Sequence, residues 1–184
     1  MRQLLLLRHA KSSWDDPRLS DHARPLNARG RRAAQSIAAA MRDLGLAPDL
    51  VLVSSARRTL QTMEALTPFE GSPLVEPMDD LYLAGWTSLL DVLRRLPETV
   101  RRVLVIGHNP GLHELALALA GPAGMATGGP ALERLAAGYP TGALSEFAIA
   151  VPWRLLEGGS GRLTRFLTPA DLAPEPGDTS EAAA

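Results

Sequence analysis

The 184-residue chain contains no cysteine, which excludes disulfides, zinc–thiolate sites, iron–sulfur clusters and thiol nucleophiles. This absence is compatible with a reducing compartment, and we expect the protein to be cytoplasmic. A long hydrophobic run is also missing, because the N-terminal stretch Leu4–Leu7 ends at Arg8. Such a stretch is far shorter than a signal-peptide core or a membrane span, so we interpret it as a buried strand and expect no membrane partner.

An excess of charge of one sign is missing as well. The chain has 19 Lys and Arg residues against 20 Asp and Glu residues, which gives a formal net charge of -1. No overall basic field is therefore available to attract nucleic acid or anionic lipid, and we expect neither as a partner. Affinity for an anion would have to come from a local cluster of cations.

The composition that remains is that of a globular protein. Hydrophobic residues make up 46% of the chain and charged residues 21%, and the length suits one domain. From residue 169 onward proline, alanine and acidic residues dominate, and Leu172 is the last large apolar residue. We therefore predict one domain over residues 1–168 and a disordered acidic tail over residues 169–184.

Short apolar runs alternate with longer stretches of helical character. The runs predict strands over residues 4–7, 50–53 and 103–106, and helices are expected over residues 28–44, 57–66, 87–96 and 110–121. This alternation favours an α/β fold, a three-layer sandwich with a mostly parallel central sheet flanked by helices. Residues 143–151 and 162–167 are expected to complete the sheet. An antiparallel orientation of one of these two strands, at an edge of the sheet, is a further possibility. Residues 121–142 are predicted to be a loop-rich insertion around a short helix over 131–137.

Basic side chains follow all three predicted parallel strands. Arg8 and His9 follow the first strand, Arg57 and Arg58 come shortly after the second, and His108 follows the third. Because ligands bind at the carboxyl ends of the strands in α/β sheets, we expect these side chains to converge.

Guanidinium groups bind phosphate oxygens bidentately, and a neutral imidazole can attack phosphorus. The cluster therefore predicts a site for a phosphorylated ligand. The alternative is that His9 and His108 only cap helices or satisfy backbone groups. For His22 and His113 we expect such structural roles, and Asn27 is expected to cap the first long helix.

Three segments resemble the histidine phosphatase superfamily, which has the phosphoglycerate-mutase-like fold. They read LLRHAKS over residues 6–12, RPLNARG over residues 24–30 and GHNPG over residues 107–111, and they are similar to the SixA-type phosphohistidine phosphatases. The similarity extends over residues 1–167. It implies that His9 is the nucleophile that becomes phosphorylated and that Arg8, Arg58 and His108 line the phosphate pocket. Weaker matches assign substrate binding to three further residues, Ser12, Asn109 and Arg57.

The general acid of better-known members has no clear counterpart here. Asp80 is the candidate that the resemblance suggests, and Asp15, Asp16 and Asp21 of the first loop are the alternatives. An alkoxide leaving group needs a proton, whereas imidazole departs readily from a P–N bond, so a missing acid favours phosphoramidate substrates. No metal-binding cluster is apparent, and we expect neither a metal nor another cofactor.

The leading hypothesis is a metal-independent phosphatase that acts through phosphorylated His9 on protein phosphohistidine, carried for example by a phosphotransfer protein. One alternative is a broad phosphomonoesterase for small metabolites, which would need a working carboxylic acid. Another is a phosphate binder without catalytic activity. Mutase activity is less expected, because the short chain has few residues for a lid that would exclude water.

Overall fold

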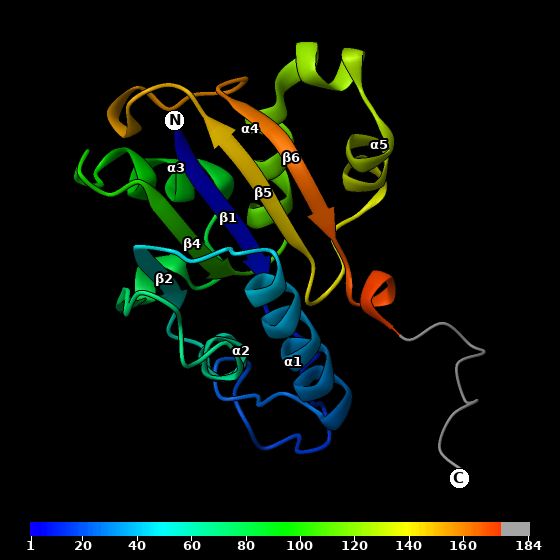
Figure 1. Cartoon of the computed structure of the whole chain (residues 1–184). Helices are drawn as coiled ribbons and strands as arrows, with labels where there is room; N and C mark the ends of the chain where they lie inside the picture. The colour runs from blue at the N-terminus through cyan, green and yellow to red at the C-terminus, as the bar shows by residue number, and fades with distance from the viewer. Residues whose placement is uncertain (174–184) are drawn as a thin grey trace, which may run out of the picture.

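The computed structural model describes residues 1–173 of the chain. One six-stranded sheet lies between two layers of helices, with the strands in the order β3-β2-β4-β1-β5-β6 (Figure 1). The strands are β1 (Arg2–Arg8), β2 (Leu50–Ser54), β3 (Leu74–Met78), β4 (Arg102–Gly107), β5 (Leu144–Ile149) and β6 (Gly161–Leu167). The helices are α1 (Ala28–Asp43), α2 (Arg57–Ala65), α3 (Trp86–Arg94), α4 (Gly111–Thr127) and α5 (Pro130–Ala137).

The α/β sandwich is confirmed, but the sheet is mixed rather than mostly parallel. β1, β2, β3 and β4 pair in parallel, whereas β5 is antiparallel to both β1 and β6. The antiparallel strand therefore lies inside the sheet and not at its edge. The physical reason is the short connection between β5 and β6, which leaves no room for the helical crossover that parallel neighbours require.

Alternating side chains of the central strands build a core on each face of the sheet. Leu4 and Leu6 of β1 belong to the core beneath α3 and α4, whereas Leu5 and Leu7 belong to the core beneath α1 and α2. All four leucines are fully buried, as expected for a strand that is covered on both faces. This packing holds the carboxyl end of β1 in place.

β3 was not predicted from the sequence. It is an edge strand with the sequence LVEPM, and the side chain of Leu74 is 61% exposed. Pro77 cannot donate a backbone hydrogen bond, which is tolerated only where one side of the strand is unpaired. The strand has no fully buried apolar run: it pairs with β2 alone, and only Val75 and Met78 pack, partly buried, against the two cores.

The segment 121–142 is more helical than the predicted loop-rich insertion. α4 continues to Thr127 across a kink at Gly121, where φ is 65°, and α5 follows directly. A Cβ atom at Gly121 would lie 2.7 Å from the Cα of Gly159. The Gly121-Pro122 pair therefore ends the first helical segment of α4 where the chain passes close to Gly159, as the sequence predicts, and a second segment runs on to Thr127.

The domain also extends beyond residue 168, where the tail was predicted to begin. Residues 169–172 form a short 3-10 helix, η3 (Pro169–Leu172), with a capping box between Thr168 and Asp171. The Asp171 carboxylate pairs with Arg134 of α5, and Leu172 packs against the core beneath α1. The remainder of the predicted tail, residues 174–184, lies outside the described residues.

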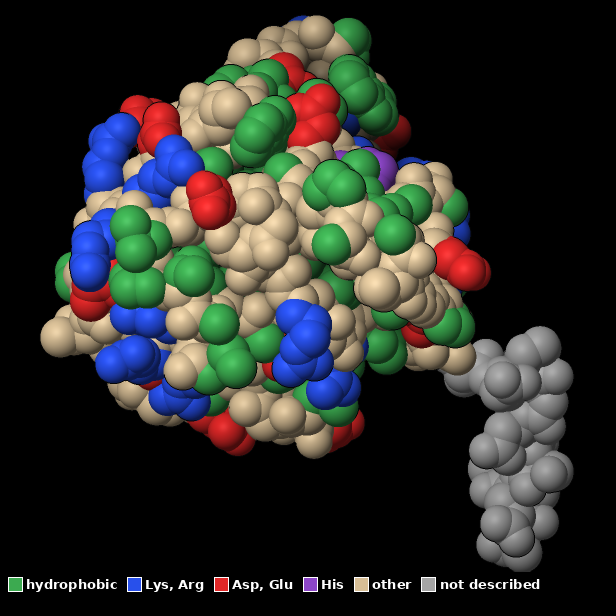
Figure 2. All heavy atoms as spheres, turned by 90° about the horizontal axis from the view of Figure 1, so that it is seen from above, with side chains coloured by type: hydrophobic (Ala, Val, Ile, Leu, Met, Phe, Trp, Pro, Cys, Tyr) green, Lys and Arg blue, Asp and Glu red, His purple; other side chains and the backbone are tan. Residues whose placement is uncertain are grey.

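Charged side chains of both signs are interspersed on the face where the parallel strands begin. Figure 2 shows this face from above, with hydrophobic side chains scattered between the charged ones. Within residues 1–173, the helices are all too short or too polar to cross a lipid bilayer.

Candidate active site

A cleft of about 350 Å³ opens at the carboxyl ends of the parallel strands. The loop between β1 and α1, blue in Figure 1, runs along this edge of the sheet. Six of the sequence-predicted residues come together there: Arg8, His9, Ser12, Arg58, His108 and Asn109. The cleft is completed by five other residues, Lys11, Trp14, Arg24, Leu83 and Thr141.

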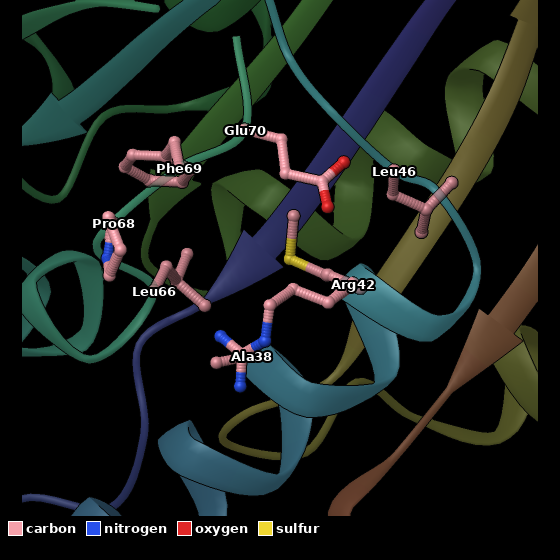
Figure 3. Close-up of a pocket in the computed structure, with 8 residues that line it drawn as sticks. Ala38, Arg42, Leu46, Leu66, Pro68, Phe69 and Glu70 are labelled. Carbon is pink, nitrogen blue, oxygen red and sulfur yellow. The ribbon is translucent and has the colours of Figure 1, made fainter. Parts of the chain in front are cut away.

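A second, much smaller pocket of about 20 Å³ lies between the carboxyl ends of α1 and α2 (Figure 3). Its lining is mainly apolar and includes Leu46, Leu66 and Phe69, with Arg42 and Glu70 at its border. Neither its size nor its lining suits a phosphorylated ligand. The cleft at the strand ends is therefore the candidate active site.

His9 presents a neutral imidazole to the cleft. Its Nδ1 atom lies 2.7 Å from the Ala10 carbonyl oxygen, which can only accept, so Nδ1 carries the proton and donates. The Nε2 atom therefore keeps its lone pair. Burial, together with the charges of Arg58 and Arg8, lowers the pKa of His9 to about 4, although the Ala10 hydrogen bond raises it. The imidazole of His9 is therefore uncharged at neutral pH, and its Nε2 lone pair is available for nucleophilic attack.

His108 is held in the opposite tautomer by its two neighbours. A guanidinium group can only donate, so Nη2 of Arg58, 3.4 Å away, donates to Nδ1 of His108. The proton then sits on Nε2, which donates to the Ser54 hydroxyl at 2.7 Å. Burial and the nearby His9 and Arg58 lower the pKa of His108 to about 3. The centroids of the His9 and His108 rings are 5.2 Å apart.

Asp21 accepts hydrogen bonds from two arginines of the cleft. Its carboxylate accepts hydrogen bonds from Arg58 Nη2 at 3.0 Å, from Arg24 Nη1 at 2.9 Å and from the Tyr82 hydroxyl at 2.6 Å. The backbone carbonyl of Asp21 accepts a further bond from Arg58 Nη1 at 2.7 Å. The Tyr82 hydrogen bond and the Arg58 charge lower the pKa of Asp21 to about 2. This carboxylate stays ionised and serves as a fixed counter-charge.

Arg24 is fixed on every side. Its Nε donates to the Ser13 carbonyl at 2.9 Å, and its Nη2 donates to the Ser12 hydroxyl at 2.6 Å. The Trp14 ring covers the guanidinium, with 3.1 Å between the guanidinium carbon and the ring centroid. Trp14 itself is 76% exposed. Three arginines, Arg8, Arg24 and Arg58, thus line one cleft in fixed orientations.

The loop before β5 accepts hydrogen bonds from two residues of the cleft. Arg8 Nη1 and Asn109 Nδ2 both donate to the Tyr139 carbonyl, at 2.9 and 2.8 Å. Nη2 of Arg8 forms no hydrogen bond within residues 1–173 and remains free to donate to a ligand. Burial, with the charge of Arg58, lowers the pKa of Arg8. Crowding of like charges of this kind favours an anionic ligand.

Two predicted residues lie elsewhere. Asp80 lines a groove between β3 and α3 with Leu74, Val92 and Leu96, and it is not among the residues that line the cleft. Arg57, which precedes Arg58 in α2, is exposed and also does not line the cleft. A helix turns about 100° per residue, so adjacent arginines point to different sides, and only Arg58 is buried.

The alternative acids also differ in placement. Asp15 is exposed in the first loop, and Asp16 forms an ion pair with Arg18 on the surface. Asp21 alone among these aspartates contacts cleft residues, and it is held ionised. The carboxyl groups proposed as acids from the sequence are therefore either remote from the cleft or charged.

Sequence reasoning missed the roles of Arg24, Tyr82 and Ser54. None of them follows the pattern of a strand end that directly carries a cation. Ser54 is the last residue of β2, and the Arg24 segment folds back because the Ser13 amide donates to the Pro25 carbonyl at 2.8 Å. The signal that could have identified Arg24 was the position of this residue in the RPLNARG segment.

Taken together, the cleft offers two neutral imidazoles and three oriented guanidinium groups. The guanidinium groups can bind a tetrahedral dianion and stabilise the charge that develops as a phosphoryl group is transferred. Among residues 1–173, no three His, Asp or Glu side chains lie close enough together to hold a metal ion. The arrangement can support phosphoryl transfer to an imidazole.

Comparison with known proteins agrees with this chemistry. The family model described as histidine phosphatase superfamily (branch 1) matches residues 4–82, which include β1, α1 and α2. An uncharacterised protein of Mycobacterium tuberculosis is 33% identical over 163 residues, which cover 89% of this chain and 99% of that protein.

Two solved structures of candidate SixA phosphohistidine phosphatases share the fold. The one from Nakamurella multipartitia superimposes with a TM-score of 0.80 at 28% identity, covering 91% of this chain and 96% of the other. The one from Agrobacterium tumefaciens has a TM-score of 0.77 at 30% identity, covering 91% of this chain and 98% of the other.

Proposed function

Because this chain belongs to the histidine phosphatase superfamily, we propose that it is a phosphatase that hydrolyses protein phosphohistidine through a phosphorylated His9. The observation that carries the proposal is the tautomer of His9. The Ala10 carbonyl holds the proton on Nδ1, so the Nε2 lone pair faces a cleft lined by arginines. The similarity to candidate SixA phosphohistidine phosphatases supports the same class of substrate.

The first step transfers the phosphoryl group to the protein. Nε2 of His9 forms a bond to phosphorus as the P–N bond of the substrate breaks. The substrate imidazole already carries a proton on its other ring nitrogen, so it keeps the electron pair of the P–N bond and leaves as neutral imidazole. Arg8, Arg24 and Arg58 stabilise the charge on the phosphoryl oxygens, and His108 lines the same cleft and accepts a hydrogen bond from Arg58. Ser12 and Asn109 border the phosphoryl position, whereas Arg57 is left without a contact to it.

The second step regenerates the nucleophile. The oxygen of a water molecule forms a bond to phosphorus, the bond from phosphorus to His9 breaks, and inorganic phosphate leaves with the protons of the water. The open cleft admits the water from solvent. The guanidinium groups neutralise the phosphoryl charge in both steps, so we propose that the reaction needs no metal ion.

The state of Asp21 favours a P–N bond over an alkyl ester. A carboxylate whose pKa is lowered to about 2 cannot donate a proton to an alkoxide at neutral pH. Imidazole is a far better leaving group than an alkoxide and departs without such an acid. The phosphoryl donor is therefore a phosphorylated histidine, which a phosphotransfer protein can present at the open cleft.

A comparison of two substrates tests this function. Hydrolysis of a phosphohistidine-bearing protein and of glycerol phosphate is measured with the full chain in the presence of EDTA. We expect turnover of the first substrate only, and none by the His9→Ala variant. Comparable cleavage of glycerol phosphate would favour a phosphomonoesterase with an acid from another source. Binding of phosphate without any turnover would favour a phosphate binder.

The intermediate gives a second readout. After rapid acid-free quenching, wild-type protein mixed with the phosphohistidine substrate should carry one phosphoryl group, labile to acid and stable to alkali. His9→Ala should carry none, while its circular dichroism spectrum matches that of the wild type. A phosphorylated His9→Ala protein would overturn the assignment of the nucleophile.

A further inference from the structure

A second groove of about 220 Å³ continues from the cleft along the start of α1. Lys11 and Thr141 line both the cleft and this groove, so the two hollows share a wall. The groove is completed by residues of α1, the loop before β5 and the segment leading into η3, namely Arg29, Ala33, Pro140, Thr168, Pro169 and Ala170. In Figure 1 the turn before β5 and η3 lie on the same side of α1.

The charged side chains of this groove are all cationic. Lys11 and Arg29 are exposed, and neither forms an ion pair or a side-chain hydrogen bond within the described part of the chain. Asp171, which follows the groove residues in η3, pairs with Arg134 instead. The groove therefore extends the positive charge of the cleft with two cations that have no anion beside them.

The position of Arg29 is electrostatically unfavourable for the fold. It lies in the first turn of α1, where the helix dipole favours acidic residues, and that turn contains none. A cation at a helix N-terminus is destabilising unless an anion comes close to it. An anionic partner that lies in the groove would relieve this repulsion.

The backbone beneath these cations is rigid. The Lys11 carbonyl accepts a hydrogen bond from the Asn27 amide at 3.0 Å, and a Cβ at Gly30 would lie 2.0 Å from the same oxygen. On the other wall, the Gly142 amide lies 3.1 Å from the carbonyl oxygens of both Arg8 and His9. The groove is thus fixed relative to the residue that we propose as nucleophile.

From this geometry we infer that the groove binds an acidic stretch of the polypeptide that carries the phosphohistidine. The inference rests on the proposed function. With the phosphorylated imidazole in the cleft, the chain on one side of it runs past Lys11 and Thr141 into the groove. Aspartate or glutamate side chains there meet Arg29 and Lys11. Arg29 is then a specificity-determining residue that does not touch the reacting atoms.

The test uses three peptides that carry phosphohistidine flanked by Glu, Ala or Lys residues, together with free phosphoramidate as a substrate without flanks. We expect the wild-type kcat/KM to be highest for the Glu-flanked peptide and lowest for the Lys-flanked one. In Arg29→Glu this preference should be lost, with about a fivefold fall for the Glu-flanked peptide and no change for phosphoramidate. The fall should come mainly from KM and should shrink at high salt.

Arg42→Glu is the matched control. The substitution changes the net charge by the same amount as Arg29→Glu, and Arg42 lies in the same helix. Arg42 borders the small pocket of Figure 3, about 20 Å along the helix from Arg29. It should leave the peptide preference unchanged. Equal kcat/KM values of the wild type for all three peptides would overturn the inference, whereas no turnover of any phosphohistidine peptide would overturn the proposed function.

A variant truncated after Ala173 tests whether the groove is occupied by a partner polypeptide or by a segment of the same chain. If an acidic partner binds the groove, the truncated chain should keep the preference for Glu flanks and its sensitivity to Arg29→Glu. A truncation that raises kcat/KM for every peptide, and removes the effect of Arg29→Glu, would show that the segment after Ala173 competes for the groove. That result would contradict the assignment to a partner.

Discussion

The Asp21 carboxylate and the Arg58 guanidinium form a two-point contact behind the cleft. Arg58 donates from Nη2 to Oδ2 at 3.0 Å and from Nη1 to the Asp21 backbone carbonyl at 2.7 Å. The Arg58 side chain is only 4% exposed, whereas the Asp21 side chain is 43% exposed, so the buried guanidinium is held by a carboxylate at the protein surface. One aspartate from the first loop thus orients an arginine from α2 toward both histidines.

Asp21→Asn should weaken catalysis without abolishing it. The amide keeps the shape of the carboxylate but loses one acceptor and the negative charge, so Arg24 and Arg58 lose their shared anchor. We expect kcat for a phosphohistidine substrate to fall about tenfold. Asp16→Asn, which removes a surface ion pair in the same loop, is the control and should have little effect. An unchanged kcat in Asp21→Asn would show that other contacts suffice to orient Arg58.

The two cleft histidines should make stability depend on pH. The unfolded chain protonates them below about pH 6.5, whereas the folded chain keeps His9 neutral to about pH 4 and His108 to about pH 3. The unfolded state therefore binds more protons between these values. The free energy of unfolding should fall as the pH decreases, by about 1.4 kcal/mol per pH unit for each histidine.

Urea denaturation at pH 7 and pH 5 measures this effect. The difference in unfolding free energy between the two pH values should shrink in a variant that combines His9→Gln with His108→Gln. An unaltered difference in that variant would assign the pH dependence to other groups.

Gly30→Ala should distort the cleft, although Gly30 does not line it. The added Cβ would meet the Lys11 carbonyl oxygen at 2.0 Å, so the loop that carries Lys11 and Ser12 must shift away from α1. We expect a loss of stability of about 1–3 kcal/mol and a raised KM. Gly124→Ala in α4, where the nearest atom would be 3.8 Å away, is the control and should keep both values. Equal melting temperatures of the two variants would contradict the close contact.

Asn27→Ala should destabilise the fold through α1. The Asn27 side-chain oxygen accepts from the Gly30 amide at 2.7 Å and caps the first turn of the helix. Its loss is expected to lower the free energy of unfolding by about 1 kcal/mol. Asn27→Asp or Asn27→Ser should restore most of the loss, because both side chains can cap. Thermal unfolding of the three variants provides the measurement.

The sequence by itself determined the elements that carry local signals. Buried apolar runs fixed β1, β2 and β4, the Asn27 cap marked the start of α1, and the cations after these strands indicated a phosphate site. These features depend on residues that are close together in the chain. The strand-end rule then placed Arg8, His9, Arg58 and His108 at one edge without any knowledge of distances.

The tertiary structure decided what depends on distant contacts. β3 exists because it pairs with β2, and the antiparallel direction of β5 follows from its place between β1 and β6. Asp21 became an ionised anchor only through Arg58 and Tyr82, which lie 37 and 61 residues away in the chain. A carboxylate has the same side chain whether it donates a proton or holds an arginine. Its neighbours set its pKa, and the fold supplies those neighbours.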